Sequence, residues 1–282
     1  MIMSSRTIWS DNGTINDLSV ALGNFKSGAQ VFPFVTAEDY LYIGSDFAFN
    51  HRYIDVSVVN DQSGTLSIDI WDGEAWNAAE DIIDQTSVGG VPLAQSGVIS
   101  WVADDDELWS RENTNDDGDS VTGLTGVKIR DLFWARLKWS SDLNALTAIN
   151  FIGHKFSDDN DLEVFYPDLT RTAVKAQFKA AKSDWNIQNI QAAEEIIKDL
   201  KRTRIIKSEN QLLNWELFRD ASVHKVAEIA FNAFGKDFFE NRDAARALYK
   251  LELDKAIYHV DTNSNARLDV KERALTEGKL YR

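Results

Sequence analysis

The chain has 282 residues, a length that corresponds to about two domains of ordinary size. Hydrophobic residues make up 44% of it and the net charge is −15, a composition typical of ordered globular proteins. Cysteine is absent, which excludes disulfides, cysteine zinc sites and thiol nucleophiles. The apolar stretches are too short to cross a membrane and residues 1–10 lack a secretion-signal pattern. We therefore expect a protein made in a reducing cytoplasm, with no membrane partner.

The charge is divided unevenly along the chain. Residues 1–170 contain 9 basic and 28 acidic residues, a net charge of −19, whereas residues 171–282 contain 21 basic and 17 acidic residues, a net charge of +4. A segment at −19 repels phosphates, so it is not expected to clamp nucleic acid by counterion release. An acidic surface suits solubility, a cationic partner, or a wall past which DNA slides without adhering.

The first part of the chain predicts an arm followed by strands. Residues 1–30 have few regular signals, and we expect an arm that becomes ordered on a neighbouring copy. Apolar residues alternate with polar ones over residues 31–157, which predicts half-buried strands and an antiparallel β-sandwich, jelly-roll-like in form. Asp72-Gly73, between Trp71 and Trp76, predicts a tight hairpin. The alternating apolar sets are Ile54, Val56 and Val58; Leu66, Ile68 and Ile70; Ile99 and Trp101; and Phe133, Ala135, Leu137 and Trp139.

The second part of the chain predicts helices. Residues 158–170 are expected to form an acidic linker, and residues 171–259 a helical, adaptor-like bundle of four or five helices. Ser208 and Gln211 form a capping-box pattern, and Gly235 stands where a helix end is expected. Three apolar sets have helical spacing: Ile187, Ile190, Ile197 and Leu200; Val223, Val226, Ala230 and Phe234; and Ala244, Leu248 and Leu251. The expected fold class is α+β multidomain, an antiparallel sandwich followed by an α-helical bundle.

No pattern indicates catalysis. The four histidines, His51, His154, His224 and His259, are far apart in the sequence and none has a metal-binding spacing, so each is expected to be structural or on the surface. Phosphate-binding glycine loops and nucleophile elbows are absent from the sequence. The many carboxylates are best explained as solvated loop charge, although a glycosidase pair would use the same residue type. We therefore expect no enzyme.

Tryptophans in the predicted sandwich suggest an interface. Trp101 and Trp139 lie on the buried side of the alternation and are expected in the core. Trp134 shares the opposite face with Arg136 and Lys138, which makes it the best candidate for an exposed or interfacial ring. These three residues are the predicted interface, and a sugar-stacking surface is the alternative use of such rings.

The C-terminal segment, residues 260–282, contains an EF-hand-like loop and a tail. The loop matches the calcium-binding pattern at positions 1, 3, 5, 9 and 12, with an apolar eighth residue. Ala266 replaces the glycine of position 6 and only three of the ligands are charged, so binding should be weak, and a metal-free turn is an equal alternative. The candidate ligands are Asp261, Asn263, Asn265, Asp269 and Glu272.

Four stretches resemble the sandwich modules of virion proteins of tailed bacteriophages, over about a hundred residues. The helical part, with Ile187 to Leu200, Asp220 to Phe234 and Arg246 to Tyr258, is similar in arrangement to phage head-to-tail adaptor domains. The four stretches are Tyr40-Leu-Tyr-Ile-Gly-Ser-Asp-Phe-Ala-Phe-Asn50, Asp69-Ile-Trp-Asp-Gly-Glu-Ala-Trp76, Leu93-Ala-Gln-Ser-Gly-Val-Ile-Ser-Trp101 and Asp131-Leu-Phe-Trp-Ala-Arg-Leu-Lys-Trp-Ser140.

The resemblance implies a structural connector of the virion neck. Many copies, usually twelve, form a ring between the portal and the tail, and DNA passes through the lumen without specific contacts. The implied partners are other copies of the chain, the portal protein and tail or neck proteins, and no cofactor is implied beyond weakly bound Ca²⁺. The alternative is a tail or baseplate module whose sandwich binds carbohydrate or a receptor.

Overall fold

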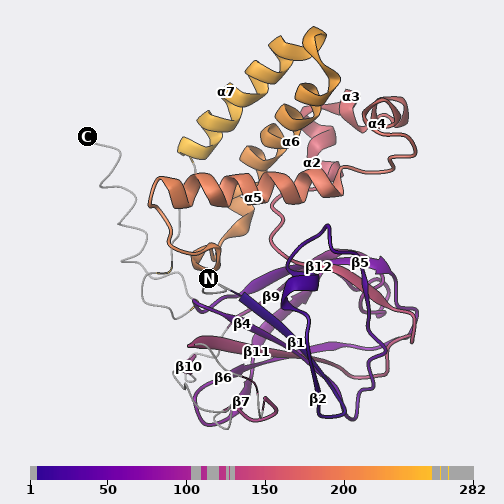
Figure 1. The fold of residues 1–282 in the computed structure, drawn as a ribbon, viewed down its shortest axis with the longest axis vertical. Coiled ribbons are helices and arrows are strands. Elements are labelled where there is room, and N and C mark those ends of the chain that lie inside the picture. The colour runs from indigo at the N-terminus through magenta and orange to yellow at the C-terminus, as the bar shows by residue number, and fades with distance from the viewer. Residues whose placement is uncertain are drawn as a thin grey trace. The chain divides into compact units, whose positions relative to one another are not determined.

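The computed structural model describes residues 5–102, 109–112, 121–124, 127, 131–255, 261 and 266. The fold is α+β, with two antiparallel sheets followed by helices that lie mostly in the C-terminal part (Figure 1). The chain divides into two compact units. The sheet unit contains the strands described below, and its main segment ends at Gly153. The helical unit begins at His154. Among the described residues, no helix is both long and apolar enough to span a bilayer.

The first sheet has the strand order β2-β1-β4-β11-β6-β7, and β10 pairs with β11 outside this path. All its pairs are antiparallel. Its strands are β1 (Ser5–Asp11), β2 (Thr14–Asp17), β4 (Tyr40–Ser45), β6 (Leu66–Trp71), β7 (Trp76–Ala78), β10 (Arg111–Glu112) and β11 (Leu132–Trp139).

The second sheet has the order β3-β12-β5-β9-β8, also antiparallel throughout. A short helix, α1 (Ser19–Leu22), contacts β1 and β12. The strands of this sheet are β3 (Gln30–Val31), β5 (His51–Val58), β8 (Glu80–Asp84), β9 (Gly97–Val102) and β12 (Ala148–Gly153).

Aromatic side chains connect the two sheets. The Trp101 ring of β9 lies 5.3 Å from the Phe49 ring, which lies 5.2 Å from Trp109, and Trp109 lies 6.2 Å from Phe133 of β11. Each buried ring of this size contributes roughly 1.5–3 kcal/mol by leaving water. The predicted strands are confirmed, because every alternating apolar set lies in β5, β6, β9 or β11.

The predicted N-terminal arm is wrong. Residues Ser5–Asp11 form β1, which pairs with both β2 and β4 inside the first sheet. Ile8 is fully buried and the Trp9 ring packs 4.6 Å from the Phe32 ring. Because β1 has buried side chains on both of its faces, its sequence lacks the apolar–polar alternation from which strands are predicted.

The hairpin between β6 and β7 forms as predicted. Trp71 pairs with Trp76, and the Asp72 side chain accepts the backbone N–H groups of Glu74 and Ala75 at 2.7 and 2.6 Å. Gly73 has φ +107, a value that side chains disfavour. The aspartate and the glycine therefore both determine this turn.

The helical unit is built around α6, which packs against α5 and α7 (Figure 1). Val223, Val226 and Ala230 of α6 are fully buried, as the helical spacing predicts. Its elements are the helices α2 (Asp159–Phe165), α3 (Pro167–Thr170), α4 (Thr172–Phe178), α5 (Asn186–Arg202), α6 (Arg219–Phe234) and α7 (Phe239–Lys255), and the 3₁₀ turns η1 (Glu209–Gln211), η2 (Trp215–Phe218) and η3 (Lys236–Phe238).

Residues 158–170 are helical rather than a linker. Asp158 and Asp161 form a reciprocal capping box at the start of α2, and Pro167 is the first residue of α3. The predicted cap of Ser208 and Gln211 is present, but it begins the 3₁₀ turn η1 and not a longer helix. Gly235 ends α6 with φ +92, as predicted.

The predicted apolar faces of two helices are confirmed only in part or not at all. In α5, Ile190 and Leu200 are buried as predicted, but Ile187 is 45% exposed and Ile196 is buried instead of Ile197. In α7 the buried residues are Ala245 and Tyr249, so the predicted stripe that includes Leu248 and Leu251 is largely outside the core.

Candidate interaction surfaces

The predicted interface on β11 has one buried and two half-buried residues. Trp134, Arg136 and Lys138 share a face of the strand, as expected from alternation. Trp134 is nevertheless 0% exposed, so its predicted exposure is wrong. Val121, Leu124 and Val127 pack in the same hydrophobic cluster as Trp134 and cover this end of the sheet. The whole cluster also includes Ile8, Tyr42, Trp71 and Leu132.

Gly44 leaves the space that the Trp134 ring occupies. The two residues are directly opposite each other in the β4–β11 pair. A Cβ atom on Gly44 would lie 2.8 Å from one ring carbon of Trp134 and 2.9 Å from another. The glycine is therefore required here by close approach of the ring to the backbone.

Arg136 lies between two aromatic rings. Its guanidinium carbon is 4.9 Å from the ring centroids of both Tyr40 and Trp76, and its Nε donates to Oδ2 of Asp69 at 2.7 Å. The Nζ of Lys138 is 5.2 Å from the Tyr40 centroid. We call these five residues the cation–aromatic surface. It has two positive groups and one negative group in a part of the chain that is otherwise strongly acidic.

The Tyr42 ring packs against the Trp76 ring of this surface. Burial raises the pKa of Tyr42 to about 12, although the neighbouring Arg136 charge lowers it. The Trp76 indole packs 5.6 Å from the Tyr42 ring, and its Nε1 donates to the carbonyl of Thr122 at 2.9 Å. The rings are thus held in place by hydrogen bonds and packing, and the surface is suited to stacking and charge pairing.

The helical unit contains an apolar groove of about 370 Å³, with a few polar groups at its rim. Phe165 and Leu248 line it and remain 43% and 40% exposed, and Leu251, one turn further along α7, is 47% exposed. The other lining residues are Tyr166, Pro167, Asp168, Leu169, Val174, Gln177, Phe231, Phe234, Phe238, Asn241, Ala244 and Ala245.

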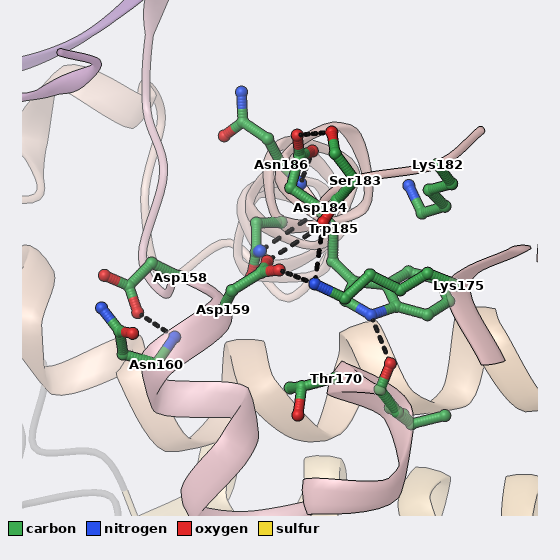
Figure 2. Close-up of polar contacts among 12 residues, drawn as sticks. Asp158, Asp159, Asn160, Thr170, Lys175, Lys182, Ser183, Asp184, Trp185 and Asn186 are labelled. Atoms are coloured by element: carbon green, nitrogen blue, oxygen red, sulfur yellow. Dashed lines mark hydrogen bonds and ion pairs between the residues drawn. The ribbon is translucent and has the colours of Figure 1, made fainter. Parts of the chain in front are cut away.

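Asp159 of α2 makes polar contacts with two other parts of the helical unit (Figure 2). Its Oδ1 accepts the backbone N–H of Trp185 at 2.9 Å, and its Oδ2 lies 3.1 Å from Nζ of Lys175 in α4. The fully buried Trp185 indole in turn donates from Nε1 to the carbonyl of Leu169 at 2.8 Å. One carboxylate therefore connects α2, α4 and the start of α5.

A histidine and a tyrosine pair beside the groove. Nδ1 of His224 lies 2.8 Å from the Tyr166 hydroxyl, and burial lowers the pKa of His224. His51 and His154 are also buried, which fits their expected structural role, and His259 lies outside the described residues. No group of three potential metal ligands occurs among the residues that the structure describes.

One predicted calcium ligand can be placed. Asp261 is fully buried, whereas Asn263, Asn265, Asp269 and Glu272 lie outside the described residues.

Sequence signals for the two surfaces were incomplete. The alternation placed Arg136 and Lys138 correctly, but Tyr40 and Trp76 became part of the surface only through pairing of β11 with β4 and of β6 with β7.

Comparison of the chain with protein-family models, curated proteins and solved structures gave no match.

Proposed function

We propose that the chain is a structural protein of a tailed bacteriophage, without catalytic activity, which forms an oligomeric ring at the neck between the portal and the tail. In this proposal the sheet unit is a jelly-roll-like sandwich domain, and the helical unit is an adaptor domain that contacts the portal. DNA passes through the lumen of the ring. The resemblance of four sequence stretches to phage virion sandwiches supports this role.

The observation that carries the proposal is the exposed apolar groove of the helical unit. Phe165 and Leu248 line this groove among mostly aromatic and aliphatic residues and are 43% and 40% exposed. Leu251 of α7, which is not among the lining residues, is 47% exposed. Exposed apolar surface of this kind is typical of sites that bind another protein or a ligand, and we propose that a protein covers this one. The occupant we propose is a neighbouring copy of this chain, because a ring needs two unlike surfaces that meet head to tail.

The charge distribution is compatible with a DNA channel. Residues 1–170 have a net charge of −19, so a lumen lined by this part would repel the phosphates of passing DNA. The part from residue 171 onward, at +4, offers a surface of the opposite sign to an acidic neighbour. This complementarity supports contact between copies and a lumen to which DNA does not adhere.

The proposal is tested by the mass of the purified chain in solution. Light scattering over a range of protein concentrations, with and without a portal ring, is expected to show a ring or a stable complex with the portal. Leu248→Ser combined with Leu251→Ser should prevent this assembly while the chain stays folded, since both side chains are already partly in water.

A matched control is available. Leu146, in the sheet unit, is 69% exposed, and Leu146→Ser should assemble like the unchanged chain. A chain that stays monomeric at every concentration and does not bind the portal would overturn the proposal. Assembly that survives the double substitution would exclude the groove as the contact.

A second candidate function is carbohydrate or receptor binding by a tail or baseplate module. The observation that favours it is the half-exposed rings of Tyr40 and Trp76 next to Arg136. A glycan array probed with the full chain would show binding that is lost in Trp76→Ala but kept in Phe239→Ala, which removes a 39% exposed ring from the helical unit. The buried Trp134 is unsuitable for this test.

A further inference from the structure

The positive charge of the second part of the chain is concentrated in ten residues. Residues 198–207 contain five basic residues and one acidic residue, a net charge of +4, which equals the net charge of all residues 171–282. The rest of that part has 16 basic and 16 acidic residues and is neutral. We call residues 198–207 the basic segment. It consists of the end of α5 and the loop that leads to η1.

The cations of the basic segment are exposed, and two of them have no ionic partner. The side chains of Lys198 and Arg202 are 73% and 77% exposed, and each pairs only with an acidic residue of the same helix. Lys201 and Arg202 lie in the last turn of α5, where the helix dipole favours cations. That cause does not extend to Arg204 and Lys207, which follow the helix, are exposed, and make no ion pair within the described part of the chain.

Arg204 stands at a position that glycine fits better. Its φ is +60, and it is the left-handed residue with which α5 ends. The backbone N–H of Arg204 donates to the carbonyl of Lys201 at 3.1 Å, and that of Ile205 donates to the carbonyl of Leu200 at 3.0 Å, the pattern of a Schellman motif. Glycine is usual here because it has no Cβ. A cation is thus kept at a cost in local stability, which is a feature of sites that contact a ligand or a partner.

The sheet unit offers a surface of opposite charge. Residues 53–110 contain 12 acidic residues and no lysine or arginine. Glu74, Glu80 and Asp81 are exposed, and within the described structure their carboxylates have no hydrogen bond or ion pair. Other carboxylates of this stretch accept hydrogen bonds from their own chain: Asp55, Asp61, Asp69, Asp72 and Asp84.

Two of the free carboxylates lie on an edge strand. Glu80 and Asp81 begin β8, the last strand in the order β3-β12-β5-β9-β8, and no further described strand pairs with its outer side. We call Glu80 and Asp81 the acidic edge. An edge strand is accessible to another chain along its whole length, so these carboxylates can be reached by a neighbouring copy.

We infer that the basic segment of one copy binds the acidic edge of the next copy. The inference rests on the proposed ring and identifies one of its head-to-tail contacts, which need two unlike surfaces on the same chain. Opposite charges steer the encounter of two copies and fix the register in which they meet. Nucleic acid suits the basic segment less well, because a chain with a net charge of −15 repels a phosphate backbone.

Exchange of the charges tests the contact. Arg204→Glu with Lys207→Glu, and separately Glu80→Lys with Asp81→Asn, should each weaken association of the full chain by about tenfold or more, because attraction is lost or becomes repulsion. All four changes in one chain should restore most of the association. Sedimentation velocity over a range of protein and NaCl concentrations measures it, with a portal ring present if the chain assembles only there. Asparagine is chosen because it tolerates the φ of +46 that Asp81 adopts.

Arg204→Gly separates the contact from the stability of the fold. Glycine tolerates a φ of +60, so this variant should raise the midpoint of thermal unfolding while it weakens association. The control is Lys26→Glu with Lys179→Glu, two exposed lysines outside the basic segment. It changes the net charge as much as the double reversal at Arg204 and Lys207 and should associate like the unchanged chain.

The outcomes distinguish this contact from the ring itself. Association that persists in both reversed variants would overturn the contact and leave the ring standing, and so would a loss that the four combined changes do not repair. A chain that stays monomeric, alone and with a portal ring, would overturn both. Binding of a DNA duplex that is lost in Arg204→Glu with Lys207→Glu, while association is unaffected, would assign the basic segment to nucleic acid and overturn the contact.

Discussion

Replacement of Asp159 by alanine should destabilise the helical unit selectively. The substitution removes the ion pair with Lys175 and the acceptor for the Trp185 backbone N–H. Both charged side chains are shielded, with exposed fractions of 29% for Asp159 and 13% for Lys175. A hydrogen bond to a charged group contributes about 1.5–3 kcal/mol, and Lys175 keeps its bond to the Ser183 carbonyl, so we expect a total loss of about 2–4 kcal/mol.

Asp159→Asn is the matched variant. An amide oxygen can still accept the Trp185 N–H, but the charge that pairs with Lys175 is lost, so the expected cost is only about 1 kcal/mol. Denaturant unfolding followed by near-ultraviolet circular dichroism measures the free energy of unfolding of each variant. Hydrogen exchange with mass spectrometry then localises the effect, which should lower protection in residues 172–190 and leave β4 and β11 unchanged.

Two results would refute this reasoning. If the alanine and asparagine variants were equally stable, the hydrogen bond to Trp185 would contribute nothing. If the sheet unit lost protection to the same extent as residues 172–190, Asp159 would not act locally in the helical unit.

Three further changes have defined outcomes. Gly44→Ala should cost about 1–3 kcal/mol by overpacking, because the added Cβ meets the Trp134 ring, and thermal unfolding would show it as a lower midpoint. Burial would raise the pKa of Glu209, but hydrogen bonding and attraction to Lys201 lower it to about 2. The pair therefore stabilises the fold fully above about pH 4.5, and this stabilisation is lost as the pH falls toward 2. Lys201→Gln should flatten this part of a profile of stability against pH. Gly235→Ala should cost about 1 kcal/mol in denaturant unfolding, from its φ of +92 alone, because no atom lies near the added Cβ. A destabilisation by Gly235→Ala as large as that of a core cavity would contradict this account.

Local sequence signals predicted the elements that depend on local physics. The turn at Asp72-Gly73 forms because aspartate accepts the N–H groups that follow it and glycine tolerates φ +107. The end of α6 at Gly235 has the same kind of cause. Alternation also placed β5, β6, β9 and β11 correctly, since a half-buried strand needs only a period of two.

The errors concern which face is covered, and this depends on contacts between distant residues. Alternation assigned Trp134 to the face opposite the core, but Val121 and Leu124 cover that face from a segment without strand or helix signals. The exposed face of α7, proposed for assembly, could not be predicted from the sequence for the same reason. In α7 both Leu248 and Tyr249 belong to apolar stripes, and only packing against α6 determines that Tyr249 is buried and Leu248 exposed.

The N-terminal strand also went unrecognised for a physical reason. β1 lies between β2 and β4 and buries side chains on both sides, but two of the buried residues, Thr7 and Ser10, are polar, so neither face of its sequence is recognisably apolar. The turn at Ala266 is a different case, because alanine gives no sequence signal for its φ of +58 and only the structure shows the backbone N–H of Ala266 donating to Asp261.

The central place of β4 in its sheet has a consequence during synthesis on the ribosome. β4 pairs with β1 on one side, which is made before it, and with β11 on the other, which begins 87 residues later at Leu132. At about 5–20 residues per second, the open edge of β4 waits on the order of ten seconds for its partner. Throughout that interval a row of unpaired backbone groups faces the crowded surroundings of the nascent chain, where another unfinished copy is a competing partner. In the finished fold this edge of β4 lies inside the sheet, but during synthesis it is open. Misassembly between nascent chains would therefore begin there.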